Sequence, residues 1–203
     1  MKLNLGSGNK RFEGFINIDD DPHVNPDYLI NLDDVNLVLP FDDNSVEEIK
    51  AIHVLEHIGD GFIRLMQELY RVSKDGCIID IVAPNEYHAV FYGDPTHKRP
   101  INVNIFHTLS KSKDGYLATK YGVNFVVADH SFNYDSMYIP MIQDFYKRKE
   151  EGKTTQEEEF AFMRLMREAN NIAIENVIKL EVVKHEKNTS MWSAWGRQNN
   201  SGN

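Results

Sequence analysis

The residues with the clearest chemical potential stand at the start of the chain, where a short apolar segment runs into two glycines. Residues 2–5 have the composition of a β-strand, and Gly6-Ser7-Gly8 follow directly. Because glycine has no side chain, such a turn lets the backbone approach a ligand closely. A second strand is predicted at 15–18 and ends in Asp19 and Asp20, and a carboxylate there can accept hydrogen bonds from two ribose hydroxyls. The pattern predicts a nucleoside-binding site.

Strands and helices alternate in the first half of the chain, and these elements must position the turn and the acids. Strands are predicted at 2–5, 15–18, 28–32, 48–53, 77–83, 123–128 and 177–184. The clearest helix is 60–73, where apolar residues recur at helical spacing, with Gly76 as its predicted C-cap. A second helix start, about one turn long, is predicted at 45–48. The alternation implies an α/β fold with a mostly parallel sheet, helices on both faces and ligands at the carboxyl ends of the strands.

A charged helical segment interrupts the second half at about 140–172. We interpret it as an inserted helical hairpin that covers the domain; a lid or a homodimer surface is the alternative. The chain is therefore predicted to form one domain over residues 1–190, followed by a polar tail at 191–203.

Composition excludes several classes of partner and site. The net charge of −9 argues against a broad phosphate-binding surface, and so against nucleic acid. Cys77 is the single cysteine, which predicts a buried core residue and no internal disulfide. No apolar run approaches the roughly 20 residues of a membrane span, so we expect a cytoplasmic protein without a membrane partner. The eight histidines lack a short spacing such as His-Glu-x-x-His, so no metal is predicted.

In its motifs and their order, the sequence resembles the class I S-adenosylmethionine-dependent methyltransferases, and in particular small bacterial and phage members encoded with surface-glycan genes. The resemblance covers residues 2–107 and, more loosely, 123–184. Asn4-Leu5-Gly6-Ser7-Gly8 matches the family's glycine motif, although Asn4 replaces the usual acid. Asp19, with Asp20 as the neighbouring candidate, matches the acid that holds the ribose. The resemblance implies a Rossmann-like, seven-stranded sheet with its last strand antiparallel.

Two further segments match the cofactor site of that family. Asp33-Asp34-Val35 resembles the adenine-side segment, with Asp34 as the better match and Asp33 as the alternative. His53-Val54-Leu55-Glu56-His57 resembles the segment after strand four that closes on the cofactor. The implied cofactor is S-adenosylmethionine, with S-adenosylhomocysteine as the product.

The segment 92–100 concentrates reactive side chains and resembles the Asp-Pro-Thr-His-x-Arg-Pro segment of the same small methyltransferases. A hydroxyl acceptor benefits from a general base, which is most often histidine. We hypothesise that His97 is the base or orients the acceptor, that Asp94 steadies it, and that Arg99 binds an anionic or polar substrate group. The alternative for Asp94 and His97 is a purely structural role in the loop. His57 is the second candidate base, with a structural role as its alternative.

The expected function is methyl transfer from S-adenosylmethionine to oxygen of a small-molecule or glycan-like acceptor. A protein that binds the cofactor without transfer, as a sensor or partner subunit, and an enzyme that cleaves the cofactor are the alternatives. A nicotinamide-dependent oxidoreductase is disfavoured, because Arg11 stands where the third glycine of Gly-x-Gly-x-x-Gly would lie. Asn85-Glu86-Tyr87 lacks the prolines of the amino-group DNA methylase motif, which further argues against nucleic acid.

Overall fold

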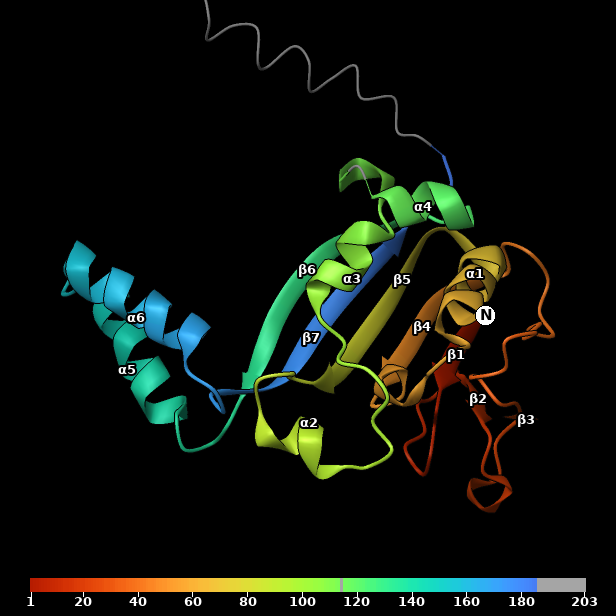
Figure 1. Cartoon of the computed structure of the whole chain (residues 1–203), viewed down its shortest axis with the longest axis horizontal. Helices are drawn as coiled ribbons and strands as arrows, with labels where there is room; N and C mark the ends of the chain where they lie inside the picture. The colour runs from red at the N-terminus through yellow and green to blue at the C-terminus, as the bar shows by residue number, and fades with distance from the viewer. Residues whose placement is uncertain (114, 186–203) are drawn as a thin grey trace, which may run out of the picture.

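A seven-stranded sheet forms the centre of the protein in the computed structural model, which describes residues 1–113 and 115–185 (Figure 1). The strands are β1 Lys2–Leu5, β2 Ile16–Asp19, β3 Tyr28–Leu29, β4 Val46–Ile52, β5 Ser73–Pro84, β6 Phe125–Tyr134 and β7 Ala173–Val182. Their order is β3-β2-β1-β4-β5-β7-β6, and β7 is antiparallel to both of its neighbours, whereas the other pairs are parallel. The predicted mostly parallel sheet with an antiparallel last strand is confirmed.

The described α-helices all come after β4 in the sequence. They are α1 Phe62–Val72, α2 Ala89–Gly93, α3 Val103–Thr108, α4 Tyr116–Tyr121, α5 Ile139–Glu150 and α6 Gln156–Glu168. In Figure 1, α1 and α3 lie over one face of the sheet. No described helix is long and apolar enough to cross a bilayer.

The main hydrophobic core lies between this face of the sheet and α1. Alternate residues of the central strands, such as Leu5, Ile49 and Ile81, are buried there, because successive strand side chains point to opposite faces. The helix contributes its apolar stripe, which includes Leu65 and is buried. Cys77 belongs to the same core, as predicted, and burial raises the pKa of its thiol.

Ion pairs follow the opposite face of the central strands. Lys2 contacts Glu48 at 2.7 Å, and Lys50 contacts Asp80 at 3.2 Å across neighbouring strands. Lys179 of β7 lies 3.7 Å from Asp80 and extends the row. These side chains keep between 20% and 50% of their exposure, so this part of the second face stays in contact with solvent.

Sheet pairing overrides two predictions of local structure. The helix α1 ends at Val72, and Ser73 begins β5 at once because it pairs with Val46 of β4. Gly76 therefore lies inside a strand and is not the predicted helix cap. For the same reason residues 46–48 begin β4, so the prediction of a short helix at 45–48 is wrong. Paired strands satisfy the backbone here better than one isolated helical turn.

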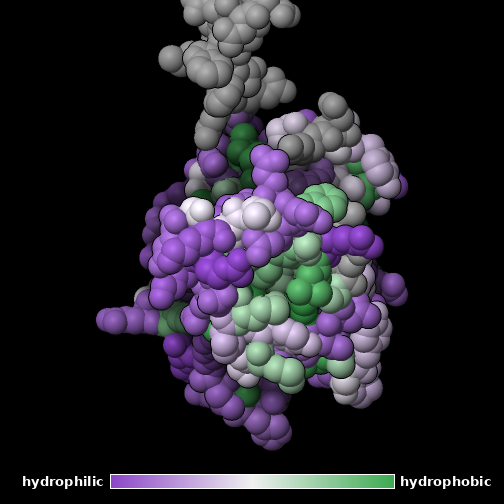
Figure 2. Space-filling view, turned by 90° about the vertical axis from the view of Figure 1, so that its left-hand side faces the viewer, coloured by the Kyte–Doolittle hydropathy of each residue, from purple (hydrophilic) through white to green (hydrophobic). Residues whose placement is uncertain are grey.

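The helices α5 and α6 occupy the predicted insertion, between β6 and β7, and project beyond the end of the sheet rather than lying over it (Figure 1). They have a small core of their own, in which the rings of Phe145 and Phe162 stack with centroids 3.6 Å apart. Phe160 and Met163 of α6 are exposed, and Figure 2 shows an apolar patch ringed by hydrophilic residues on this end of the molecule. The predicted tail at 191–203 lies outside the described residues.

Candidate functional site

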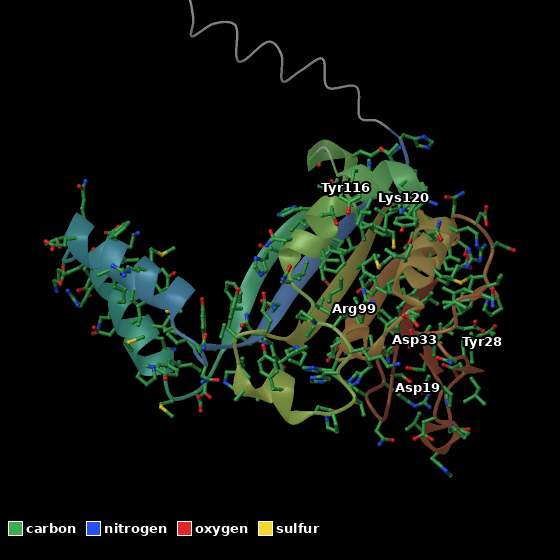
Figure 3. All side chains as sticks on the ribbon, viewed as in Figure 1. Asp19, Tyr28, Asp33, Arg99, Tyr116 and Lys120 are labelled. Carbon is green, nitrogen blue, oxygen red and sulfur yellow. The ribbon has the colours of Figure 1, made fainter. Side chains whose placement is uncertain are left out.

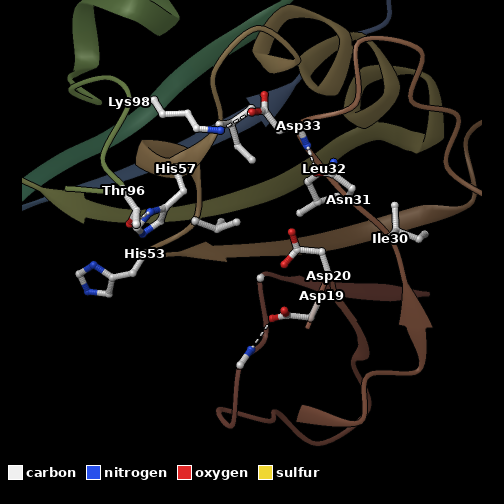
Figure 4. A pocket seen from close by; sticks show the side chains of 14 residues that line it. Asp19, Asp20, Ile30, Asn31, Leu32, Asp33, His53, His57, Thr96 and Lys98 are labelled. Carbon is white, nitrogen blue, oxygen red and sulfur yellow. Dashed lines mark hydrogen bonds and ion pairs between the residues drawn. The ribbon is translucent and has the colours of Figure 1, made fainter. Parts of the chain in front are cut away.

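A cavity of about 630 Å³ opens at the carboxyl ends of β1, β2 and β4 (Figure 4). It is lined by Gly6, Gly8, Asp19, Asp20, Ile30, Asn31, Leu32, Asp33, His53, Val54, His57, Ile58, Thr96 and Lys98. Its volume and its mixture of apolar and polar side chains are those of a small-molecule site. Figure 3 shows how Asp19, Asp33 and Arg99, which are far apart in sequence, lie at the same end of the sheet.

The glycine turn forms one wall of the cavity and packs directly on Val54. Gly6 has φ +55°, and a Cβ at this position would lie 2.5 Å from Val54 Cγ2. The turn is held by the Gly8 N–H, which donates to Asp19 Oδ2 at 2.8 Å. Beneath it, the buried Asn4 side chain donates to Asn17 Oδ1 at 2.9 Å. Asn4 therefore supports the turn from within the fold and does not line the cavity.

Asp19, the last residue of β2, and Asp20, which follows it, have different surroundings. Asp19 Oδ1 accepts from the Asp21 N–H at 3.0 Å, so both of its oxygens receive a backbone amide. In Figure 4 the carboxylate of Asp20 points from the same strand end into the cavity. Asp19 shapes the glycine turn, and Asp20 presents its carboxylate to the cavity.

Asp33 lines the cavity and ties two loops together. Its Oδ1 accepts from the N–H groups of Gly59 and Gly61 at 2.8 and 2.9 Å, and its Oδ2 accepts from Lys98 Nζ at 2.6 Å. Burial acts to raise the pKa of Asp33, but Lys98 and the two amides outweigh it and hold the pKa below its usual value.

Asp34, the residue favoured from the sequence, instead accepts from the Asn36 N–H in a local turn, and Val35 is exposed. Neither of them lines the cavity. The structure therefore favours the sequence-based alternative, Asp33, because the chain turns between the two aspartates.

The segment that follows β4 contributes His53, Val54 and His57 to the cavity. His53 adopts φ +54°, a left-handed conformation that is unusual outside glycine and concentrates at functional sites. Its Nε2 lies 2.9 Å from Glu175 Oε1 of β7. The pKa of His53 is raised, chiefly by the neighbouring Glu56 carboxylate and also by Glu175.

Arg99 binds backbone carbonyls. Its Nε donates to Ile58 O at 2.9 Å and its Nη2 to Gly59 O at 2.6 Å, while the guanidinium lies 4.4 Å from the centroid of the Phe62 ring. Arg99 does not line the cavity. The geometry thus indicates that it anchors the 94–100 loop onto the segment after β4, in place of the substrate contact hypothesised from the sequence.

Asp94 orients His57 through Thr96. The Thr96 hydroxyl donates to Asp94 Oδ1 at 2.6 Å and lies 2.9 Å from His57 Nδ1. The hydrogen bonds from Thr96 lower the pKa of Asp94. The distance from Asp94 Oδ2 to His97 Nε2 is 3.8 Å, which is too long for a hydrogen bond. Asp94 therefore acts on His57 more directly than on His97.

His97 lies directly behind His57, with little of its side chain exposed. Its ring stacks on Phe91 with centroids 5.3 Å apart, and its Nδ1 is 2.6 Å from Phe91 O. The His57 ring meets it edge to face at 4.8 Å. Of the two histidines, His57 lines the cavity, and His97 packs against the His57 ring from behind.

Only some of the predicted cofactor-binding residues line the cavity. Those that line it are Gly6, Gly8, Asp19, Asp20, Asp33, His53, Val54 and His57. Leu5 and Leu55 are buried in the core, and Ser7 is buried beneath the turn.

The residues that sequence reasoning missed are Ile30, Asn31, Leu32, Ile58, Thr96 and Lys98. The first three directly follow β3, so the rule of strand carboxyl ends could have found them.

A second cavity, of about 410 Å³, lies between the strands β6 and β7, the start of α3 and the α5–α6 pair. Its lining residues are Asn85, Glu86, Tyr87, Asn102, Val103, Asn104, His130, Phe132, Tyr134, Tyr146, Met163, Met166, Ala169, Asn171, Ala173 and Asn176. The Glu86 carboxylate accepts from the amides of Asn102 and Asn176 at 3.1 and 3.0 Å. Amides, one carboxylate, the His130 imidazole and four tyrosine or phenylalanine rings line this space, and no lysine or arginine is among its described lining residues.

The strand order and the antiparallel β7 form a Rossmann-like sheet that matches the fold of solved S-adenosylmethionine-dependent methyltransferases. Solved structures share it. An S-adenosylmethionine-dependent methyltransferase from Archaeoglobus fulgidus is 16% identical, with 89% of this chain and 85% of that chain covered and a TM-score of 0.53. One from Mesorhizobium loti is 10% identical, with 89% of each chain covered and a TM-score of 0.52.

The fold alone does not define the reaction. SpnF, named as a [4+2]-cyclase, is 14% identical over 91% of this chain and 75% of its own, with a TM-score of 0.51. No protein-family model and no curated protein matches the sequence.

Proposed function

We propose that this protein is an S-adenosylmethionine-dependent methyltransferase that methylates a hydroxyl of a small-molecule or glycan-like acceptor. The observation that carries the proposal is the glycine turn packed on Val54, with Asp19 and Asp20 beside it, at the carboxyl ends of parallel strands. Ligands bind at this edge in open α/β sheets.

The residues present fit the cofactor. Gly6 and Gly8 line the cavity without side chains, so an extended ligand can lie against the backbone there. Asp20 points into the cavity and would accept hydrogen bonds from ribose hydroxyls, while Ile30 and Leu32 offer apolar surface to a purine ring. When bound, S-adenosylmethionine supplies a methyl group activated by its sulfonium; the protein has to orient the acceptor and help it to lose a proton.

The second cavity supports an uncharged, hydroxyl-rich acceptor. Its amides and Glu86 can exchange hydrogen bonds with hydroxyl groups, and its aromatic rings can cover apolar faces. The lack of lysine and arginine among its described lining residues disfavours a phosphorylated or carboxylated group there. The two cavities are neighbours in the fold, since His53 of the first contacts Glu175, and the next residue, Asn176, lines the second.

The histidine pair at the wall of the first cavity supports transfer to oxygen. A hydroxyl must lose its proton to become a good nucleophile, and a positioned imidazole is the usual group that assists. His57 lines the cavity, and Thr96 and Asp94 orient it. We propose that His57 and His97 together prepare the hydroxyl, with Asp94 and Arg99 positioning them.

Calorimetric titration with S-adenosylmethionine and S-adenosylhomocysteine tests the cofactor site. We expect binding by the wild type and a loss of at least about tenfold in affinity for Asp20→Ala, whose carboxylate faces the cavity. Asp34→Ala is the matched control, because this nearby aspartate is outside the cavity, and it should bind like the wild type. Absence of binding by the wild type would refute the proposal.

Transfer itself is tested with a methyl-labelled cofactor and a panel of simple glycosides. A labelled glycoside would support methyl transfer to oxygen. If methylthioadenosine forms without acceptor, the protein is a cofactor-cleaving enzyme; if the cofactor binds and stays intact with every acceptor, a sensor or partner subunit is the better description.

A further inference from the structure

Three metal-ligating side chains converge at the wall of the first cavity. Glu56 and His57 belong to the short helical turn after β4, and His97 comes from the loop that follows α2. One ligand atom from each of the three lies within 4.8 Å of the others.

The backbone fixes this convergence. The N–H groups of Lys98 and Arg99 donate to the carbonyl of Glu56 at 2.7 and 3.3 Å. The guanidinium of Arg99 donates to the carbonyls of Ile58 and Gly59. Together these four hydrogen bonds hold the His97 loop against the Glu56 turn, so the three side chains are preorganised.

The buried carboxylate of Glu56 receives no hydrogen bond from the described residues, and His53 is its ion-pair neighbour. The residue is 1% exposed, and neither of its oxygens accepts a hydrogen bond from a described residue. His53 Nδ1 lies 3.4 Å from Oε1, beyond the normal range of a hydrogen bond. A buried carboxylate whose oxygens accept no hydrogen bond is unfavourable, and a bound cation offsets that cost.

Both histidines leave Nε2 available as a ligand atom. Phe91 O can only accept, so the contact of 2.6 Å requires a proton on His97 Nδ1 and leaves Nε2 as the lone pair. The single proton of the Thr96 hydroxyl goes to Asp94, so this hydroxyl accepts from His57 Nδ1 and again leaves Nε2 free. Metal-binding histidines characteristically donate their second N–H to such carbonyl or hydroxyl groups.

We propose that Glu56, His57 and His97 bind one divalent first-row transition-metal ion through a carboxylate oxygen and the two Nε2 atoms. Two imidazoles with one carboxylate form a donor set that zinc and iron sites use, whereas calcium and magnesium prefer oxygen ligands alone. The prediction that no metal binds depends on the lack of a short ligand spacing in the sequence. Here the third ligand is forty residues from the second, and only the fold brings it close.

This site also gives the proposed function a means of activating the acceptor, and that part of the inference rests on the proposed function. His57 lines the cavity, so an ion bound to it lies at the cavity wall. Three protein ligands leave a coordination position for water or substrate. An acceptor hydroxyl bound there would release its proton to water more readily, because the ion stabilises the alkoxide. The two imidazoles would then serve as ligands and not as free bases.

The experiment uses the full chain without an affinity tag, freed of metal by a chelator and titrated with Co²⁺. Visible ligand-field absorption and calorimetry should report one ion per chain in the wild type. Both His97→Ala and Glu56→Gln should weaken binding at least about tenfold. His23→Ala is the control for adventitious binding, since His23 is exposed in the turn after β2, and it should bind like the wild type.

Thermal unfolding separates a metal site from a structural ion pair. Zn²⁺ should raise the Tm of the wild type but not that of Glu56→Gln, because an ion that binds only the folded chain stabilises it. Without metal, Glu56→Gln should be at least as stable as the wild type, since it removes a buried charge whose oxygens accept no hydrogen bond. A metal-free Glu56→Gln protein that is clearly less stable would assign Glu56 to an ion pair with His53 and contradict the site.

The failure of this inference can be distinguished from failure of the proposed function. If Co²⁺ does not bind, or binds equally to His97→Ala, the metal site is refuted, whatever the calorimetry with S-adenosylhomocysteine shows. If Co²⁺ binds as described and neither cofactor form binds, the metal site stands and the proposed methyl transfer fails.

Discussion

At the scale of single residues, the cavity depends on backbone conformations that few side chains tolerate. Gly6 combines a left-handed φ of +55° with the close contact to Val54, and His53 adopts a left-handed φ of +54° without being glycine. Both residues line the cavity, one at the end of β1 and one at the end of β4. These neighbouring strand ends therefore define the wall that a ligand would contact.

We predict that Gly6→Ala weakens binding of S-adenosylhomocysteine at least about tenfold, because the new Cβ would lie 2.5 Å from Val54 Cγ2 and shift the wall. Calorimetry measures the effect. Gly14→Ala is the matched control: Gly14 also has a positive φ, of +78°, but its Cβ would meet nothing within 4 Å. Both variants carry a conformational cost of about 1–2 kcal/mol, and only Gly6→Ala should lose the ligand.

At the scale of elements, α1 anchors the long loop between β3 and β4 through one buried carboxylate. Glu68 accepts from the Leu39 N–H at 2.8 Å and from Arg71 Nη2 at 2.7 Å, and its side chain is 3% exposed. Burial acts to raise the pKa of Glu68, but the hydrogen bonds from Arg71 and Leu39 and the charges of Arg71 and Arg64 outweigh it and lower the pKa. The loop is thus held by the ionised carboxylate of Glu68, and the folded structure stabilises this charged form.

We predict that Glu68→Gln lowers the free energy of unfolding by about 1.5–3 kcal/mol at neutral pH, because it removes the carboxylate charge that Arg64 and Arg71 contact. A folded-state pKa below the ordinary value of 4.5 means that the charged form contributes stability above that value. This contribution is lost as the pH falls through the folded-state pKa of Glu68. The wild type and Glu68→Gln should therefore become more similar in their free energy of unfolding at that pH.

Urea denaturation at neutral pH and below pH 4.5 measures the difference in the free energy of unfolding between the wild type and Glu68→Gln. Glu47→Gln, at an exposed pair with Lys74, is the control and should change stability by less than about 1 kcal/mol. An equal loss for both variants would contradict the assignment.

At the scale of the whole molecule, the described residues form two hydrophobic cores of unequal size. The large one lies between the sheet and α1, and the small one joins α5 and α6 through Phe145 and Phe162. The helix pair projects from the end of the sheet (Figure 1), and the lining of the second cavity includes its residues Tyr146 and Met163. Because this pair has a core of its own, we expect it to open locally without unfolding the sheet.

We predict that Phe162→Ala accelerates amide hydrogen exchange in α5 and α6 by at least about tenfold while exchange in β1, β4 and β5 stays unchanged. Phe160→Ala is the control, because Phe160 is 72% exposed on the same helix. Faster exchange throughout the sheet would show that the two cores unfold together.

Much of the fold and about half of the candidate site could be predicted from local patterns. The apolar periods locate the strands, and parallel strands bring their carboxyl ends to one edge, so the sequence suffices to place Gly6, Asp20 and His53 together. The boundary between α1 and β5 could not be predicted in this way, because the pairing of Ser73 with Val46 depends on a strand far away in sequence.

Local sequence determines which residue types are available and where along the chain the strands that carry them lie, because periodicity and turn chemistry act over a few neighbouring residues. The direction of each side chain depends instead on the folded chain. Tertiary packing turns Asp33 and not Asp34 into the cavity, and it directs the guanidinium of Arg99 to backbone carbonyls. It also joins His97 to Glu56 and His57, because hydrogen bonds between two distant loops set those contacts, and their geometry has no local signature in the chain.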